Sequence, residues 1–177
     1  MLFNEIHYRN DKNLLDFNNS NIILRNAVRA IILNENKLLM AHLEKTDEYK
    51  FPSGGKNEDE IIEEALKREV LEEVGYKVSK IKEKIGTITE YAIAKEGGNN
   101  IFKMISEYYL VEIENKQLKQ NLEEYEMELL FKPCWVEIKT AYETNKDKIN
   151  MKINTTTGIS RETIALGILL REYNKWI

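Results

Sequence analysis

Three glutamates within one short segment, Glu69, Glu72 and Glu73, have the types and spacing that suit chemistry. On an α-helix, side chains at i, i+3 and i+4 project from the same face, so the three carboxylates are expected to share one patch. Such like-charged pairs destabilise an exposed helix by roughly 0.2–0.5 kcal/mol each, unless a cation lies between them. The spacing therefore indicates a site for a hard divalent cation such as Mg²⁺.

A glycine-containing stretch directly before these glutamates strengthens this hypothesis. An acidic helix face on its own is typical of a solvated surface. Here, however, Gly54 and Gly55 allow backbone carbonyls to approach an ion closely as ligands, and Lys56 can reach a phosphate group as a point charge. Arg68 lies beside the glutamates. The combination favours a site at which substrate phosphates join a cation beside an acidic helix.

A longer pattern, G-x5-E-x7-R-E-V-x-E-E-x-G-Y, encloses these residues and resembles the Nudix box. Its fixed positions, between residues 54 and 76, are Gly54, Glu60, Arg68, Glu69, Val70, Glu72, Glu73, Gly75 and Tyr76. The resemblance implies that Glu69, Glu72 and Glu73 bind Mg²⁺ or Mn²⁺, and that Arg68 orients these carboxylates by ion pairing. It also implies that Glu60 supports the loop or binds a second ion.

The reaction implied by this resemblance is hydrolysis of a diphosphate that links a nucleoside to another moiety, a small-molecule substrate. Metal ions in such a site neutralise charge on the phosphoryl oxygens and lower the pKa of a bound water. A carboxylate then removes the proton of that water, and Glu73 or Glu72 is favoured for this role. The alternatives belong to a second acidic stretch and are Glu123, Glu124, Glu126 and Glu128.

Two other functions are compatible with the same resemblance. A non-catalytic nucleotide-binding module usually lacks some of the box glutamates, and none is missing in this sequence. An isoprenoid diphosphate isomerase would have a cysteine upstream of the box, whereas Cys134 is the only cysteine and lies downstream. Hydrolysis of a nucleoside diphosphate derivative is therefore the leading hypothesis.

The helix that carries the glutamates is expected from about Glu60 to Val74, with Gly75 as its natural end. Apolar residues recur every four positions along it and form a narrow stripe that should face the core. These residues are Ile62, Leu66, Val70 and Val74, with Ala65 beside them. Because Ile61 has no side-chain acceptor for an N-cap, Asp59 or Asn57 is expected to take that role.

Strands are expected on both sides of this helix. Two apolar runs that start at Ala27 and are separated by the turn-like Asn34–Asn36 predict a hairpin. Strand-like segments at residues 78–94 and 101–113 flank a turn at residues 97–100, and helices follow. This order predicts an α+β fold, an α/β/α sandwich with a mixed sheet flanked by helices, which the Nudix resemblance also implies.

Length, composition and charge limit the domain organisation and the partners. The 177 residues suit one domain, with a Nudix hydrolase domain at residues 27–177 and an N-terminal lead-in at residues 1–26 that belongs to it or precedes it. A net charge of −4 disfavours nucleic acid and anionic membranes as partners. The single cysteine and the lack of a long apolar run predict a cytoplasmic protein. The lead-in could also pair with a second copy of the chain and form a homodimer.

Overall fold

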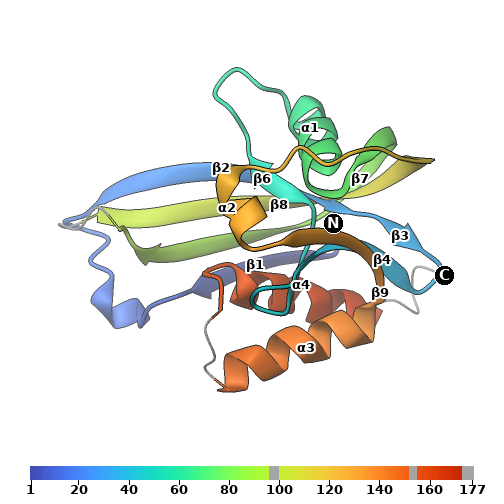
Figure 1. The fold of residues 1–177 in the computed structure, drawn as a ribbon. Coiled ribbons are helices and arrows are strands. Elements are labelled where there is room, and N and C mark those ends of the chain that lie inside the picture. Colours follow the sequence, from blue (N-terminus) through green and yellow to red (C-terminus); the bar gives the residue numbers. More distant parts are fainter. Residues whose placement is uncertain (96–99, 152–154, 173–177) are drawn as a thin grey trace.

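The computed structural model describes residues 1–95, 100–151 and 155–172 of the chain. Strands form a central layer between α1 (Ile62–Val74) on one side and α3 (Ile138–Met151) and α4 (Ile159–Glu172) on the other, as Figure 1 shows. The predicted α/β/α sandwich, a mixed sheet flanked by helices, is therefore confirmed. No described helix has the length and apolar character needed to cross a membrane.

The larger sheet contains strands in the order β1-β7-β8-β2-β6. Its strands are β1 (Phe3–Tyr8), β2 (Asn21–Ile31), β6 (Ser53–Gly55), β7 (Tyr76–Ile93) and β8 (Asn100–Gln117). The long strands β7 and β8 pair antiparallel, whereas β1 pairs with β7 and β2 pairs with β8 in parallel. Both strands predicted downstream of the acidic helix are confirmed. Of the turn predicted at residues 97–100, residues 97–99 lie outside the described residues and Asn100 begins β8.

The smaller sheet has the order β3-β4-β5, with β9 on the other side of β4. Its strands are β3 (Leu33–Asn34), β4 (Lys37–Leu43), β5 (Glu48–Lys50) and β9 (Phe131–Glu137). The predicted hairpin turn is present, and Glu35 adopts φ 52° there. However, only β3 forms the hairpin with β4. The expected pairing of the whole preceding run is wrong, because β2 already has β8 and β6 as neighbours and is buried between them from Ala27 to Ile31.

Residues of the N-terminal lead-in also contribute strands to the larger sheet. Strand β1 pairs with β7 from Phe3 opposite Gly86 to Tyr8 opposite Tyr91, and a short 3₁₀ helix, η1 (Lys12–Leu14), follows it. The Phe3 ring is buried against Gly86, where a Cβ atom would lie 2.4 Å from the ring. Strands β1 and β2 thus join the first residues of the chain to the larger sheet.

Alternation along β2 divides the buried residues between two apolar clusters. Val28 and Ala30 face the cluster that includes the apolar stripe of α1. Ile31 faces the other cluster, under α3 and α4. Because side chains of a strand alternate between its faces, Arg29 points to the same side as Ile31, towards α4. The same strand therefore supplies a core residue to the α1 layer and a charged residue to the α4 layer.

Candidate active site

Helix α1 is held in register by its apolar stripe and by Gly75. The side chains of Leu66, Val70 and Val74 are fully buried, as the four-residue spacing predicted. Gly75 ends the helix with φ 75°, and a Cβ atom there would lie 2.4 Å from the backbone carbonyl of Leu118. A residue with a side chain is thus disfavoured at this position for two reasons. This packing fixes which face of α1 carries the glutamates.

The start of α1 differs from the N-cap prediction. The N-cap residue is Ile61, and neither Asn57 nor Asp59 caps the helix with its side chain. Instead, the Glu64 carboxylate accepts a hydrogen bond from the backbone N–H of Ile61 at 3.2 Å. This bond satisfies the N–H of the N-cap residue itself, and the acidic first turn suits the positive end of the helix dipole.

Arg68 lies at the centre of a network that links the glycine-containing segment to α1. Its guanidinium donates to both carboxylate oxygens of Glu60 at 2.8 Å and to the Gly55 carbonyl at 3.1 Å. It also pairs with Glu69 and, at 3.3 Å, with Glu72. The hydrogen bonds from Arg68 hold the pKa of Glu60 below its usual value. One side chain thus positions three of the carboxylates that the sequence singled out.

Glu73 lies outside this network and has its own partners. Its carboxylate is fully buried and accepts hydrogen bonds from Lys50 Nζ at 2.7 Å and from the backbone N–H of Ser53 at 2.9 Å. Burial raises the pKa of Glu73 to about 8, although the Lys50 ammonium opposes this shift. Sequence reasoning missed Lys50 and Ser53, because no helical spacing links them to the box.

Gly54 and Gly55 belong to strand β6, so the expectation of an irregular loop at these two residues is wrong. They pair with Val28 and Ala27 of β2. A Cβ atom on Gly54 would lie 2.0 Å from Oε1 of Glu69, so that carboxylate rests directly against the Gly54 backbone. Glu69 is 7% exposed, and burial raises its pKa. Gly54 is therefore required for the close approach of Glu69.

Lys56 holds together the loop between β6 and α1. Its ammonium donates to the carbonyl of Glu60 at 2.8 Å and to the carbonyl of Asn57 at 3.1 Å. The Asn57 backbone N–H in turn donates to the Glu60 carboxylate at 3.0 Å. The side chain predicted to contact a substrate phosphate is thus engaged with its own loop, and it is not among the residues that line the adjacent cavity.

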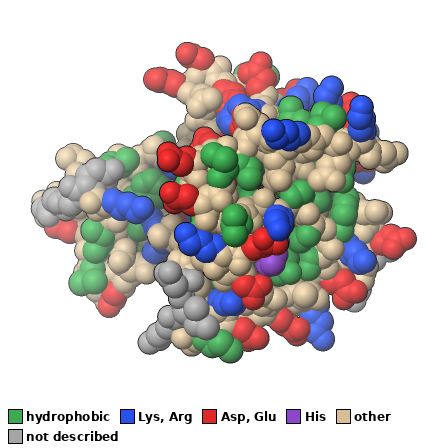
Figure 2. Space-filling view, in the orientation of Figure 1, with side chains coloured by type: hydrophobic (Ala, Val, Ile, Leu, Met, Phe, Trp, Pro, Cys, Tyr) green, Lys and Arg blue, Asp and Glu red, His purple; other side chains and the backbone are tan. Residues whose placement is uncertain are grey.

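A cavity of about 490 Å³ opens beside Gly54 and Gly55. Its cationic lining residues are Arg25, Arg29, Lys50, Lys95 and Arg161, and its acidic ones are Glu48, Glu123 and Glu162. Lys50 connects this cavity to the buried carboxylate of Glu73. On the face seen in Figure 2, Lys and Arg side chains lie next to Asp and Glu side chains across the middle of the molecule. The cavity has the size and charge to take a small anionic molecule.

The second acidic stretch lies beside this cavity as the short helix α2 (Glu124–Glu128). Glu123 and Tyr125 line the cavity. Glu126 is 3% exposed and accepts hydrogen bonds from the Glu123 backbone N–H at 2.9 Å and from the Tyr125 hydroxyl at 2.8 Å. Its charge contributes to the raised pKa of Glu73. The structure thus brings one alternative general base, Glu126, close to a box glutamate.

The floor of the cavity on the α4 side is a buried network of charges that the sequence did not reveal. Glu162 pairs with Arg29 at 2.8 Å and with Arg161 at 3.3 Å, and it accepts a hydrogen bond from the Phe51 backbone N–H at 3.2 Å. Arg161 also pairs with Glu90 at 3.3 Å. These partners lie up to 133 positions apart in the chain, so no local spacing announces them.

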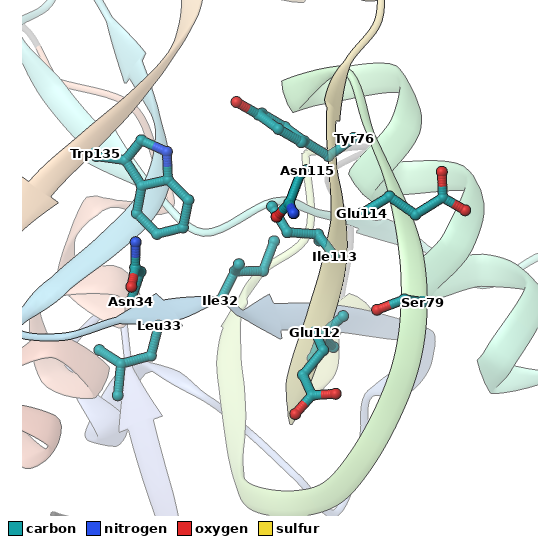
Figure 3. Close-up of a pocket in the computed structure, with 11 residues that line it drawn as sticks. Ile32, Leu33, Asn34, Tyr76, Ser79, Glu112, Ile113, Glu114, Asn115 and Trp135 are labelled. Atoms are coloured by element: carbon teal, nitrogen blue, oxygen red, sulfur yellow. The ribbon is translucent and has the colours of Figure 1, made fainter.

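Another cavity, of about 480 Å³, lies away from the glycines. Trp135 and Asn34 flank it on one side and Tyr76 and Asn115 on the other (Figure 3). Its charged lining residues are Glu112 and Glu114, and no Lys or Arg of the described chain lines it. A diphosphate would meet like charge here, so we place the candidate site at the cavity beside Gly54.

The donor set beside Gly54 fits a hard divalent cation in its chemistry. Among the residues that the structure describes, no three His, Cys, Asp or Glu side chains converge as a ready-made metal site. Arg68 engages Glu69 and Glu72, and Lys50 engages Glu73. Two of these carboxylates have pKa values raised by burial, which a nearby cation would reverse. A divalent cation that brought these carboxylates together could therefore replace Arg68 and Lys50 as their positively charged partner.

Comparison with known proteins gives one family and several similar folds. A family model described as NUDIX domain matches residues 23–154. The crystal structure of a MutT protein from Bacillus halodurans is 21% identical, with a TM-score of 0.51, and the match covers 68% of this chain and 72% of that chain. A NUDIX hydrolase from Nitrosomonas europaea is 16% identical, with a TM-score of 0.49, over 81% of this chain and 88% of that chain. No curated protein matches.

Proposed function

The chain belongs to the Nudix family, and from this premise we propose that it is a pyrophosphohydrolase dependent on Mg²⁺ or Mn²⁺. Its substrate is a nucleoside diphosphate linked to another moiety. The observation that carries the proposal is the arrangement of α1 beside the cavity. Arg68 gathers Glu60, Glu69 and Glu72 at the Gly55 carbonyl, and the buried carboxylate of Glu73 contacts Lys50, which lines that cavity.

The residues proposed to hold the cation are Glu69, Glu72 and Glu73, together with the backbone carbonyls of Gly54 and Gly55. When bound, the ion neutralises charge on the phosphoryl oxygens and lowers the pKa of a water molecule. Arg68 pairs with both Glu69 and Glu72 and holds the two carboxylates close together. If a cation paired with these carboxylates, Lys50, which lines the cavity, would be free to contact the substrate phosphates, for which an ammonium group is a suitable partner.

Proton removal from the attacking water is assigned to a carboxylate at the same place. Glu72 and Glu73 remain the first candidates, and Glu72 is the more accessible, with 28% of its side chain exposed. Glu126 is the alternative that its position near Glu73 supports. Glutamine variants of these three residues distinguish them, because loss of the base lowers kcat at every metal concentration, whereas loss of a metal ligand is relieved in part by more metal.

The remaining walls of the cavity are proposed to bind the two ends of the substrate. Lys50 and Arg25 offer positive charge beside the glycines, and Tyr125 offers an aromatic face on the opposite helix, α2. Aromatic side chains of this kind stack on nucleobases in many proteins. The cavity thus supports a molecule with a charged centre and an aromatic end.

A substrate panel tests the proposal directly. Nucleoside triphosphates, nucleotide sugars and dinucleoside polyphosphates are incubated with Mg²⁺ or Mn²⁺, and the products are separated by chromatography. We expect phosphorylated products that disappear with EDTA and with Glu73→Gln, while Glu63→Gln on the exposed side of the same helix behaves like the wild type. Turnover that persists in EDTA or in the Glu73→Gln variant would contradict the proposal.

The two alternative functions give different results in the same panel. A non-catalytic module would bind nucleotides without forming any product. An isomerase would need a reactive group near its substrate, but Cys134 lies on β9 opposite Met40 of β4 and does not line the cavity beside Gly54. Burial raises the pKa of the Cys134 thiol, which makes it less reactive. The position of Cys134 therefore argues against the isomerase, and product formation in the panel separates the hydrolase from the non-catalytic module.

A further inference from the structure

A smaller cavity of about 230 Å³ adjoins the cavity beside Gly54. The two share part of their linings, namely Arg25, Lys95, Met104, Thr157 and Arg161. The smaller cavity is lined by four cationic side chains, of Arg9, Arg25, Lys95 and Arg161, and by a single carboxylate, of Glu90. The chain as a whole has a net charge of −4, so this local excess of positive charge is unusual, and it would attract an anionic ligand.

The pairing of these charges leaves part of the positive charge uncompensated. Glu90 is 1% exposed and pairs with Arg9 at 3.1 Å and with Arg161 at 3.3 Å. Arg25 and Lys95 form no ion pair with any residue in the part of the chain that the structure describes. Two cationic groups at the border of the two cavities are therefore available to a ligand.

Arg161 is fixed in place at the boundary between the two cavities. It lies in the first turn of α4 and is 5% exposed. A Cβ atom on Gly158 would lie 2.8 Å from Nη2 of Arg161, so the glycine gives the guanidinium room. Its Nε is buried and has no hydrogen-bond partner among the described residues. A donor that is buried and unpaired is costly unless a ligand or water accepts from it.

Apolar side chains form part of the wall of the smaller cavity. Arg9 stacks over the ring of Phe102, with 5.4 Å between the guanidinium carbon and the ring centroid. Met104 and Ile93 complete the apolar part of the lining. Charges beside apolar walls act in a lower effective dielectric than charges in open water, so their attraction for an anion is stronger.

We propose that the smaller cavity binds a second anionic group of the substrate, a phosphate monoester outside the hydrolysed diphosphate. The inference rests on the proposed hydrolase function and narrows its substrate class to nucleoside diphosphate derivatives with an additional phosphate. The diphosphate itself lies elsewhere, because neither Gly54, Gly55, Lys50 nor any residue of α1 lines this cavity. One guanidinium group can donate to two oxygens of the same phosphate, and a terminal phosphate offers three such oxygens.

Matched substrates that differ by one phosphate test this assignment by kinetics. NADPH is compared with NADH, and coenzyme A with dephospho-coenzyme A. In the wild type we expect the phosphorylated member of at least one pair to have the higher kcat/KM. Lys95→Met should reduce that preference about tenfold, because it removes a positive charge from the cavity, and Lys95→Arg should retain it. Since Lys95 is exposed, the methionine is expected to remove the charge without disturbing the packing. Lys139→Met, on α3, is the control with the same change of charge.

A binding measurement without metal separates this inference from the hydrolase proposal. Dissociation constants of AMP and of adenosine 2′,5′- and 3′,5′-bisphosphate are measured by calorimetry in EDTA. We expect the second phosphate to strengthen binding about tenfold, and the gain to vanish in Lys95→Met but not in Lys139→Met. If the second phosphate changes the affinity less than twofold in the wild type, the inference is wrong even when hydrolysis occurs. A failed substrate panel with this gain intact would reject only the hydrolase.

Discussion

Two charged regions border the same cavity, and they differ in how firmly they are held. On the α1 side, the side chains of Arg68 and Glu72 are 30% and 28% exposed, and the Arg68 guanidinium forms ion pairs with three carboxylates. On the α4 side, the side chains of Arg29, Arg161 and Glu162 are only 3–6% exposed. The first region can rearrange around an added cation, whereas the second forms a fixed frame.

The sign of the charge differs between the two regions in a way that matches their proposed roles. Four glutamates surround Arg68 and Lys50 beside α1, so that region can accept a cation. Cationic residues outnumber carboxylates around the smaller cavity near α4, so that region can accept an anion. A substrate with metal-bound phosphates at one end and a further phosphate at the other would satisfy both. The two regions therefore differ at Arg68 and Glu72, which are partly exposed and can rearrange, whereas Arg29, Arg161 and Glu162 are all buried.

The largest effect is expected on folding stability, from breaking the fixed region. Glu162→Gln removes the carboxylate that Arg29 and Arg161 share and leaves two buried guanidinium groups with fewer counter-charges. We expect the free energy of unfolding to fall by about 3–5 kcal/mol, as is usual when one partner of a buried ion pair is removed. Urea denaturation followed by circular dichroism measures this change. A decrease below about 1 kcal/mol would show that the region is not a rigid frame.

A second large effect is expected on activity, from the adjustable region. Glu73→Gln replaces a proposed metal ligand with an uncharged group of the same shape. Lys50 and the Ser53 N–H donate to different carboxylate oxygens, so the single amide oxygen keeps one of these two hydrogen bonds. We expect kcat/KM for the best substrate to fall about 10²–10³-fold. The loss of folding stability should be smaller than in Glu162→Gln, because burial raises the pKa of Glu73 to about 8 and so already favours an uncharged group at this position. Steady-state kinetics with saturating Mg²⁺ and a urea titration check both parts. Equal losses of stability in Glu73→Gln and Glu162→Gln would remove the distinction between the two regions.

An intermediate effect is expected at Gly54, where strand β6 meets the adjustable region. Gly54→Ala introduces a Cβ atom 2.0 Å from the present position of Glu69 Oε1, so the carboxylate must move. We expect the free energy of unfolding to fall by about 1–3 kcal/mol, which is typical of overpacking. We also expect a weaker apparent affinity for Mg²⁺. Activity measured against Mg²⁺ concentration provides the readout. Gly55→Ala is the matched control, since its nearest neighbour is the flexible end of Arg25 at 3.1 Å.

The smallest effect is expected from an exposed ion pair on the outer face of α1. Lys67 and Glu63 lie 2.8 Å apart, and their side chains are 51% and 58% exposed. Glu63→Gln should lower the free energy of unfolding by about 0.5 kcal/mol or less, because solvent screens such pairs. The same urea experiment measures it. If this variant lost as much stability as Glu162→Gln, burial would not explain the difference between the regions.

The α1 region was readable in the sequence because its residues are close along the chain. Helical spacing alone predicted α1 and its buried stripe, and Gly75 marked the end of the helix. It also predicted one patch for Glu69, Glu72 and Glu73, but Arg68 pairs with the first two, whereas Glu73 pairs with Lys50. Spacing did not predict that Glu73 would turn towards Lys50, because that contact depends on how β5 packs against the helix. The resemblance to the Nudix box indicated metal binding and hydrolysis, and the apolar periodicity indicated the helix that carries the glutamates.

The α4 region was hidden for the opposite reason. Arg29 stands within an apolar run of β2 and gave no sign that it pairs with Glu162, which follows 133 positions later. A charged residue inside a buried strand is the one signal that could have pointed to it, because such a residue needs a buried partner. The pairing of β2 with β8 was likewise out of reach, since local pattern favoured a hairpin with the next strand.

Binding of Mn²⁺ tests most directly the claim that the glutamates of α1 gather a divalent cation. Titrations followed by electron paramagnetic resonance count the free Mn²⁺ in solutions of the wild type and of the Glu69→Gln, Glu72→Gln and Glu73→Gln variants, without any turnover. We predict that the wild type binds Mn²⁺ and that each variant binds it at least about tenfold more weakly, while Glu63→Gln binds it normally. Unchanged binding in all three variants would contradict the account.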